Sequence, residues 1–324
     1  MPVLTYREAL NQALREEMHR DPNVFIMGED IGVFEGAYKV TAGLLAEFGE
    51  KRVKDTPIAE EEIVGLGIGS AIVGLRPIVE LMTINFSLLA LDQIANHAAK
   101  MRYMFAGQVK IPITIRMPEG GGHQLAAQHS QSLAVWFAHV PGLIVVAPST
   151  PAEAKGLLKT SIRDDNPVVF IENEALYNTR EEVPEGEFLT PIAKADIKKT
   201  GNDVSIITHS RMVLVALAAA KQLEEQGISA EVVDLRTLRP LDKQTVIDSV
   251  RKTNRAIVLE EGWSTYGVNA EVAAFIQEMA FDYLDAPVRR IGGAEVPMPY
   301  ARDLEKAAIP NDQQVVAAVR ELVA

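Results

Sequence analysis

The chain has 324 residues, of which 48% are hydrophobic and 23% are charged, a composition typical of globular proteins and unlike that of disordered ones. At roughly 150 residues per domain, this length predicts two domains. A net charge of -12 argues against binding nucleic acid through its phosphates, and no apolar run approaches the ~20 residues that cross a bilayer. There is no cysteine, which excludes disulfides and thiolate catalysis, so any dithiol that takes part in the reaction must belong to another protein.

Residues 1–172 alternate between helical and strand-like patterns. Thr5 and Glu8 form a capping box, and the apolar spacing that follows predicts a helix close to the N-terminus. Because this pattern begins so early, we expect no signal or transit peptide and a cytoplasmic location. The strand-like runs in this part of the chain are "NVFIMG", "RPIVELM", "IPITIR", "GLIVVAP" and "NPVVFIE". Strands alternating with helices predict an α/β domain with a mainly parallel sheet.

The pattern breaks down over residues 173–202, which are charged, rich in turn residues and without a sustained period. We interpret this stretch as a linker. Regular alternation resumes over residues 203–324, where the strands are "DVSIITH", "SAEVVDLR", "RAIVLEEG" and "PVRRIGG". The sequence thus predicts a second, smaller α/β domain.

Three consecutive acids, Glu60, Glu61 and Glu62, stand at the start of a nearly apolar helical segment. Carboxylates at a helix N-terminus are favoured by the macrodipole at ~0.3–1 kcal/mol each, and this reading needs no function. However, successive helical residues point about 100° apart, so the three acids cannot share one environment. Gly65 and Gly69 lie on one face of the same helix and suit close approach by another backbone or a flat ligand.

Other candidate residues have ordinary structural readings. His129, in "HQLAAQHSQS", is by default a surface or capping histidine, and catalysis by it is the less common alternative. Phe86 reads as a core residue on composition alone. The helix that begins at Pro151 ends near Arg163, where orphan carbonyls precede a carboxylate and an amide. Such oxygens suit a hard cation, although a capped turn with water on the carbonyls is the more common explanation.

Several stretches together resemble the beta subunits of the thiamine-diphosphate-dependent 2-oxo acid dehydrogenases over essentially the full length. They are "GEDIGVFEGAYKVTAGL", "DTPIAE", "GLRPIVELMTINF", "AAQHSQS", "GLLKTSIRDDNPVVF", "AEVVDLRTLRPLD" and "VPMPYARDLEKAAIP". The resemblance implies a pyrimidine-binding parallel-sheet domain followed by a transketolase-like α/β domain. It also implies oxidative decarboxylation of pyruvate and acetylation of a lipoyl group on a dihydrolipoyl acetyltransferase.

The resemblance assigns roles to particular residues. Glu60 corresponds to the glutamate that faces the aminopyrimidine of the cofactor, Phe86 to an aromatic packed near it, and His129 to the family's beta-chain histidine. A structural potassium site is implied at Ile113, Ser161, Ile162, Asp164 and Asn166. The Gly-Asp-Gly motif that holds the diphosphate and Mg²⁺ is absent from the sequence, and the family carries it on an alpha subunit. The resemblance therefore implies half an active site and an α2β2 heterotetramer.

Two alternatives remain open at this point. A relative that acts on branched-chain 2-oxo acids or on acetoin has the same motifs, because substrate choice depends on a pocket shared with the alpha chain. A mainly structural subunit that docks the acyltransferase is the alternative from another class, and the acidic net charge is compatible with it.

Overall fold

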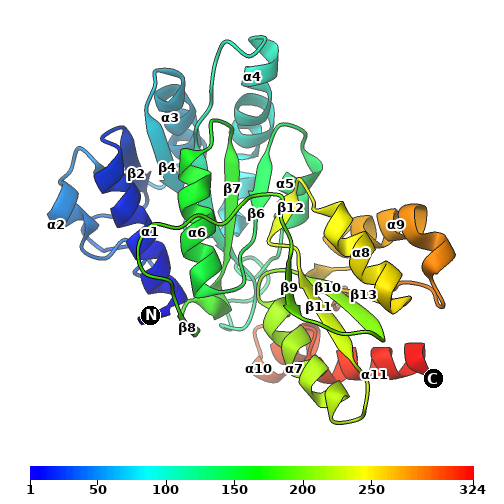
Figure 1. The fold of residues 1–324 in the computed structure, drawn as a ribbon. Coiled ribbons are helices and arrows are strands. Elements are labelled where there is room, and N and C mark those ends of the chain that lie inside the picture. The colour runs from blue at the N-terminus through cyan, green and yellow to red at the C-terminus, as the bar shows by residue number, and fades with distance from the viewer. The chain divides into compact units, whose positions relative to one another are not determined.

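A computed structural model describes residues 1–324 as two compact units, drawn together in Figure 1. Unit 1 comprises residues 1–119 and 136–192, and unit 2 comprises residues 120–135 and 193–324. Each unit contains a sheet of mainly parallel strands with helices packed on it, which confirms the predicted α/β class.

In unit 1, six parallel strands follow one another in the order β6-β7-β5-β4-β2-β3. Their bounds are β2 (Val24–Gly28), β3 (Val53–Asp55), β4 (Arg76–Glu80), β5 (Thr114–Glu119), β6 (Ile144–Val146) and β7 (Val168–Asn173). A separate antiparallel pair joins β1 (Val3–Thr5) to β8 (Arg180–Glu182). Because the main strands are parallel, the loops after β2, β3, β4, β5 and β7 leave from one edge of the sheet.

The first helix of unit 1 begins where a local sequence signal places it. The Thr5 side chain accepts from the Glu8 amide at 3.2 Å and Glu8 accepts from the Thr5 amide at 2.7 Å, which confirms the capping box. The bounds of its helices are α1 (Tyr6–Arg20), α2 (Leu44–Phe48), α3 (Glu60–Ile72), η1 (Ile84–Leu88), η2 (Gln93–Ala98), α4 (Ala99–Met104), α6 (Pro151–Arg163) and η3 (Glu174–Leu176). A further helix, α5 (Ala134–His139), has its first two residues in unit 2 and the others in unit 1. η2 is a π-helix, continuous with α4.

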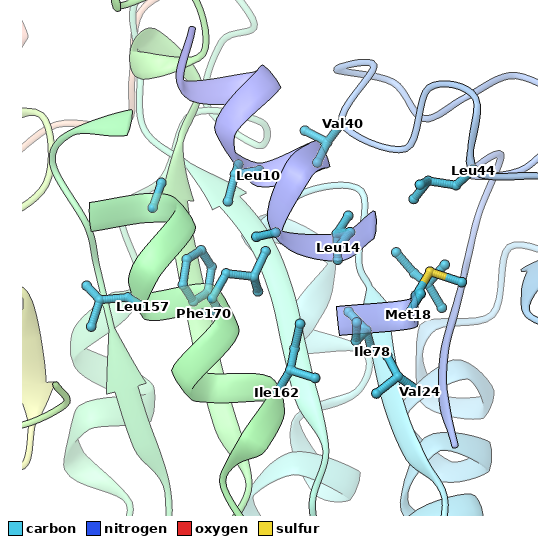
Figure 2. Close-up of a cluster of buried hydrophobic side chains, with 14 of the residues drawn as sticks. Leu10, Leu14, Met18, Val24, Val40, Leu44, Ile78, Leu157, Ile162 and Phe170 are labelled. Carbon is cyan, nitrogen blue, oxygen red and sulfur yellow. The ribbon is translucent and has the colours of Figure 1, made fainter. Parts of the chain in front are cut away.

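The core of unit 1 lies between its sheet and the pair α1 and α6, as Figure 2 shows. Leu10 and Leu14 of α1 and Leu157 of α6 are fully buried, together with Phe170 of β7. Helix α3 packs against β4: a Cβ at Gly67 would lie 2.7 Å from Val79 Cγ1. Helices on both faces explain why these strands read as continuous apolar runs and not as alternating patterns.

Unit 2 has a five-stranded sheet in the order β14-β13-β10-β11-β9, in which only β9 runs antiparallel. The strands are β9 (Asp196–Lys199), β10 (Val204–Thr208), β11 (Ala230–Asp234), β13 (Ala256–Trp263) and β14 (Arg289–Gly293), and β12 (Thr237–Arg239) lies outside this sheet. The helices are α7 (Met212–Glu224), α8 (Lys243–Thr253), α9 (Val268–Ala280), η4 (Phe281–Tyr283), α10 (Arg302–Ala308) and α11 (Asp312–Val323). α7 packs beside α11 and α8 beside α9 (Figure 1).

The stretch 173–202 folds into short elements that its sequence does not signal, namely η3, β8 and β9. β9 forms the edge of the unit 2 sheet, paired with β11. The division into domains at 1–172 and 203–324 stays a prediction. None of the helices combines the length and the apolar character needed to cross a membrane.

Glu260, on β13 of unit 2, is a buried carboxyl group with a raised pKa. It is 4% exposed, and its Oε2 accepts from the Val268 amide at the start of α9 at 3.0 Å. Burial raises the pKa of Glu260 to about 7.

This pKa predicts a loss of stability as the pH rises. The folded chain binds the Glu260 proton more tightly than the unfolded chain does, so the stabilisation is complete below about pH 4.5 and is lost as the pH rises towards 7. The total change is about 3 kcal/mol in the free energy of unfolding. Urea unfolding at pH 5 and pH 8 measures it, with Glu260→Gln as the comparison. An equal pH dependence in both proteins would contradict this assignment.

Candidate functional site

The three consecutive acids occupy different environments at the start of α3. Glu60 is 5% exposed, whereas Glu61 and Glu62 are exposed. This confirms that the helical rotation separates them. No side chain caps the helix at Ala59, so the amides of the first turn and the helix dipole favour the carboxylates.

Glu60 forms part of the wall of an open cavity of about 620 Å³ within unit 1. The cavity is lined by the first turns of α3 and by the region of η1 and η2: Ile58, Ala59, Glu60, Glu61, Glu62, Gly65, Leu66, Leu89 and Gln93. Ile58, Leu66 and Leu89 are exposed apolar side chains in this wall. A mostly apolar cavity with a buried carboxyl group is the usual form of a small-molecule or cofactor site.

Glu29 is a second titratable group near Glu60 that sequence reasoning did not single out. It directly follows β2, and its pKa is raised by partial burial, by the charge of Asp30 and by the charge of Glu60. Its position in the sequence could have marked it as a candidate, because Glu29 directly follows a parallel strand. Loops at the carboxyl ends of such strands carry functional residues in α/β folds.

The loop that carries Glu29 is held to the end of β3. Asp55 Oδ1 accepts from the Gly32 amide at 2.6 Å, and Asp55 Oδ2 accepts from the Val33 amide at 3.1 Å. A Cβ at Gly32 would lie 2.9 Å from Asp55 Oδ2, so glycine permits this close approach. Asp55 thus fixes the entry to the segment that leads to Glu60.

A buried charge network lies near the same edge of the sheet. The Arg116 guanidinium, 2% exposed, donates to Glu172 Oε1 from Nε at 2.7 Å and pairs with Glu80. Burial lowers the pKa of Arg116, but the charges of Glu172 and Glu80 outweigh burial and raise it. Burial raises the pKa of Glu172 against the opposing effect of Arg116, and the Tyr177 hydroxyl donates to Glu172 Oε2 at 2.7 Å. Breaking such a pair from one side costs roughly 3–5 kcal/mol, so the network fixes the ends of three strands.

The remaining candidates fall in different places. Phe86 lies on η1 and is partly buried, and the nearby Leu89 lines the cavity. His129 is exposed and belongs to unit 2, whereas Glu60 and Phe86 belong to unit 1.

Most of the residues implied as potassium ligands gather near the C-terminal end of α6. The carbonyl oxygens of Ile162 and Asp164 both accept from Arg76 Nη1, at 3.1 and 3.0 Å. Asn166 Oδ1 accepts from Arg102. The carbonyl oxygens of Ile113 and Ser161 accept the amides of Val168 and Asp164, at 2.9 and 3.2 Å. An all-oxygen donor set is the type that a hard cation prefers, and each carbonyl has a second lone pair, but the Arg76 guanidinium already donates to two of these oxygens.

Comparison with known proteins identifies both halves of the chain. Residues 3–180 match the family model "Transketolase, pyrimidine binding domain" and residues 193–315 match "Transketolase, C-terminal domain". A solved structure described as "Split gene transketolase, inactive beta4 tetramer" has the same fold, with a TM-score of 0.82 at 24% identity over 99% of this chain and 98% of that one.

Curated relatives are considerably closer in sequence. The pyruvate dehydrogenase E1 component subunit beta of Rhizobium meliloti is 53% identical over 99% of this chain and 70% of its own length. The mitochondrial subunit beta-1 of Arabidopsis thaliana is 53% identical over 97% of this chain and 88% of its own. The subunit beta of Rickettsia felis is 51% identical over 98% of both chains. The chain belongs to the transketolase-like family of pyrimidine-binding proteins and, within it, to the pyruvate dehydrogenase E1 beta subunits.

Proposed function

We propose that this chain is the beta subunit of a pyruvate dehydrogenase and contributes the pyrimidine-side half of a thiamine diphosphate site shared with an alpha subunit. The observation that carries the proposal is Glu60, a buried carboxyl group in the wall of an open, mostly apolar cavity. Eight relatives that are 49–53% identical are named as pyruvate dehydrogenase E1 beta subunits, which favours pyruvate over branched-chain 2-oxo acids or acetoin.

The residues present fit one part of this cofactor. The apolar side chains Ile58, Leu66 and Leu89 suit a flat heteroaromatic ring, and Glu60 suits its ring nitrogen. We assign Phe86 to packing near the same ring. The sequence has no Gly-Asp-Gly motif, so the diphosphate and its Mg²⁺ are assigned to the alpha subunit.

Glu60 then holds a proton at the pyrimidine ring nitrogen. A carboxyl group sheltered from water exchanges a proton readily with a neighbouring base, and glutamine cannot do so. Burial, the charge of Asp30 and the charge of Glu60 raise the pKa of Glu29, so a second carboxyl group lies close enough to Glu60 to interact with its charge. When bound, the cofactor supplies the electron sink that lets carbon dioxide leave.

The second half of the reaction needs groups from outside this chain. The chain has no cysteine, so the dithiol that accepts the acetyl group belongs to the lipoyl group of a dihydrolipoyl acetyltransferase. His129 is exposed, as a group that meets a substrate on a partner must be. We assign it to proton donation or substrate anchoring during that transfer.

We also propose that K⁺ binds to the oxygens of Ile113, Ser161, Ile162, Asp164 and Asn166. Arg76 already supplies one positive charge there, so a monovalent ion is favoured over a divalent one. Changing choline to potassium at equal ionic strength should raise the thermal midpoint by about 2–6 °C, because an ion that binds only the folded chain stabilises it. Asp164→Ala should abolish the increase. Equal midpoints in the two salts would contradict the site.

Co-expression with a candidate alpha chain tests the proposed function. We expect an α2β2 assembly that decarboxylates pyruvate faster than branched-chain 2-oxo acids or acetoin in the presence of thiamine diphosphate and Mg²⁺. A faster reaction with a branched-chain 2-oxo acid would assign the chain to that relative. No decarboxylation of any 2-oxo acid by a properly assembled tetramer would refute the proposal.

A further inference from the structure

The loop that carries His129, residues 120–132, has a backbone that needs outside support. Gly122 has a φ of +113°, and Gln124 and Ala126 have φ values of +58° and +66°. A non-glycine residue in this left-handed region costs roughly 1–2 kcal/mol. The loop closes on itself through the Gly120 amide, which donates to the Gln131 carbonyl at 3.3 Å. The His129 amide also donates to the Ala126 carbonyl, at 3.4 Å. These two long bonds do not fully offset two strained residues.

Glu305 of α10 supplies part of the missing support. Its side chain is buried, with an exposure of 1%. Glu305 Oε1 accepts from the Gly122 amide at 2.9 Å and from the Gln124 amide at 3.0 Å. A charged acceptor on two amides forms stronger hydrogen bonds than a neutral one. Glu305 therefore fixes the positive-φ turn from residue 122 to residue 124.

Two further charged side chains hold the neighbouring residue. Glu261 of β13 accepts from the Gly121 amide at 2.8 Å, and Arg211 donates to the Gly121 carbonyl at 2.9 Å. Arg211 and Glu261 also pair with each other, with Nη1 and Oε1 3.5 Å apart. A Cβ at Gly121 would lie 3.0 Å from Met298 Cε, so glycine lets the loop backbone approach this site closely.

We propose that Glu305, assisted by Glu261 and Arg211, is a positioning residue that fixes the loop and thereby the location of His129. Three side chains from separate elements converge on residues 121–124, while His129 itself, five residues further on, stays exposed. This arrangement holds the base of the loop, while the His129 side chain stays exposed. The inference rests on the proposed function, because it assigns His129 to the transfer step.

The contacts of Glu305, Glu261 and Arg211 with residues 121–124 are called the clamp below. Amide hydrogen exchange in the assembled α2β2 enzyme tests this clamp independently of activity. In Glu305→Ala, we expect faster exchange of the Gly122 and Gln124 amides and unchanged exchange in the sheet of unit 2. Glu295→Ala is the matched control, since Glu295 accepts a backbone amide from Thr265 at 3.2 Å, outside this loop. Unchanged exchange at Gly122 and Gln124 in Glu305→Ala would overturn the clamp even if the proposed function were wrong.

Activity measurements test whether the clamp acts through His129. We expect Glu305→Ala to lower kcat for acetyl transfer by about 10- to 100-fold with little change in KM for pyruvate, as a misplaced group does. Glu305→Gln keeps one acceptor oxygen and should restore part of the loss, and it remains a valid test if the alanine variant does not fold. In a His129→Ala background, Glu305→Gln should cost nothing more. Normal turnover in both Glu305 variants, or a further loss in that background, would overturn the positioning role.

Discussion

Replacing Glu60 with glutamine should lower turnover of the assembled α2β2 enzyme by about 100-fold or more while leaving assembly intact. Glutamine has nearly the same shape, so the wall of the cavity is preserved, but it cannot take or give a proton at the pyrimidine nitrogen. General acid–base groups typically contribute about 10²–10⁴-fold to the rate. The measurement is the initial rate of pyruvate decarboxylation at saturating cofactor, with sizing to verify the tetramer.

Glu61→Gln is the matched control for this experiment. Glu61 is the adjacent residue on the same helix, but it is exposed where Glu60 is 5% exposed. We expect Glu61→Gln to turn over at nearly the normal rate. Nearly normal turnover in Glu60→Gln would remove Glu60 from the mechanism and favour the alternative of a mainly structural docking subunit.

Replacing Gly65 with leucine should prevent assembly with the alpha chain without unfolding the beta chain. A Cβ at Gly65 meets only the end of the Gln93 side chain, at 3.6 Å, and a Cβ at Gly69 on the same face meets nothing within 4 Å. Leucine also favours a helix over glycine by roughly 0.8–1 kcal/mol. The isolated variant should therefore be at least as stable as the original chain. Size-exclusion chromatography of the co-expressed chains measures the assembly.

Gly67→Ala separates this effect from a general loss of stability. A Cβ at Gly67 would lie 2.7 Å from Val79 Cγ1 and 2.8 Å from Ile113 Cδ1, inside the packed layer beneath α3. This variant should lower the thermal midpoint of the beta chain itself. An intact α2β2 tetramer in Gly65→Leu would show that the glycine face of α3 lies outside the subunit contact.

The elements that the sequence predicts correctly are those with local causes. The Thr150 side chain accepts from the Glu153 amide at 3.3 Å, as the spacing before α6 predicts. The apolar runs that became β2, β4 and β7 are each buried along their length, apart from Arg76 at the start of β4. A helix cap or a short apolar run involves only a few neighbouring residues, so the element that it predicts does not depend on contacts with distant parts of the chain.

The parts that the sequence does not predict depend on contacts between distant residues. Arg116 meets Glu80 and Glu172 because β5 lies between β4 and β7, an order that no local pattern encodes. Glu305 reaches Gly122 from 183 residues away in the chain. β9 is short and charged, and it forms only because an edge of the unit 2 sheet was open to it.

The candidate site was accessible to sequence reasoning only in part. The acids at the start of α3 were visible from their position, but burial of Glu60 alone among them required the structure. Its role on the cofactor remains a proposal, as do those of Phe86 and His129. Glu29 was missed because an acid after a strand is common and its interaction with Glu60 is spatial.

Titration of thiamine diphosphate with Mg²⁺ into the beta chain alone and into the α2β2 assembly is the most direct test of a site completed by two polypeptides. We expect heat of binding and pyruvate consumption only for the assembly. Tight binding of the coenzyme by the isolated beta chain, accompanied by pyruvate consumption, would contradict it.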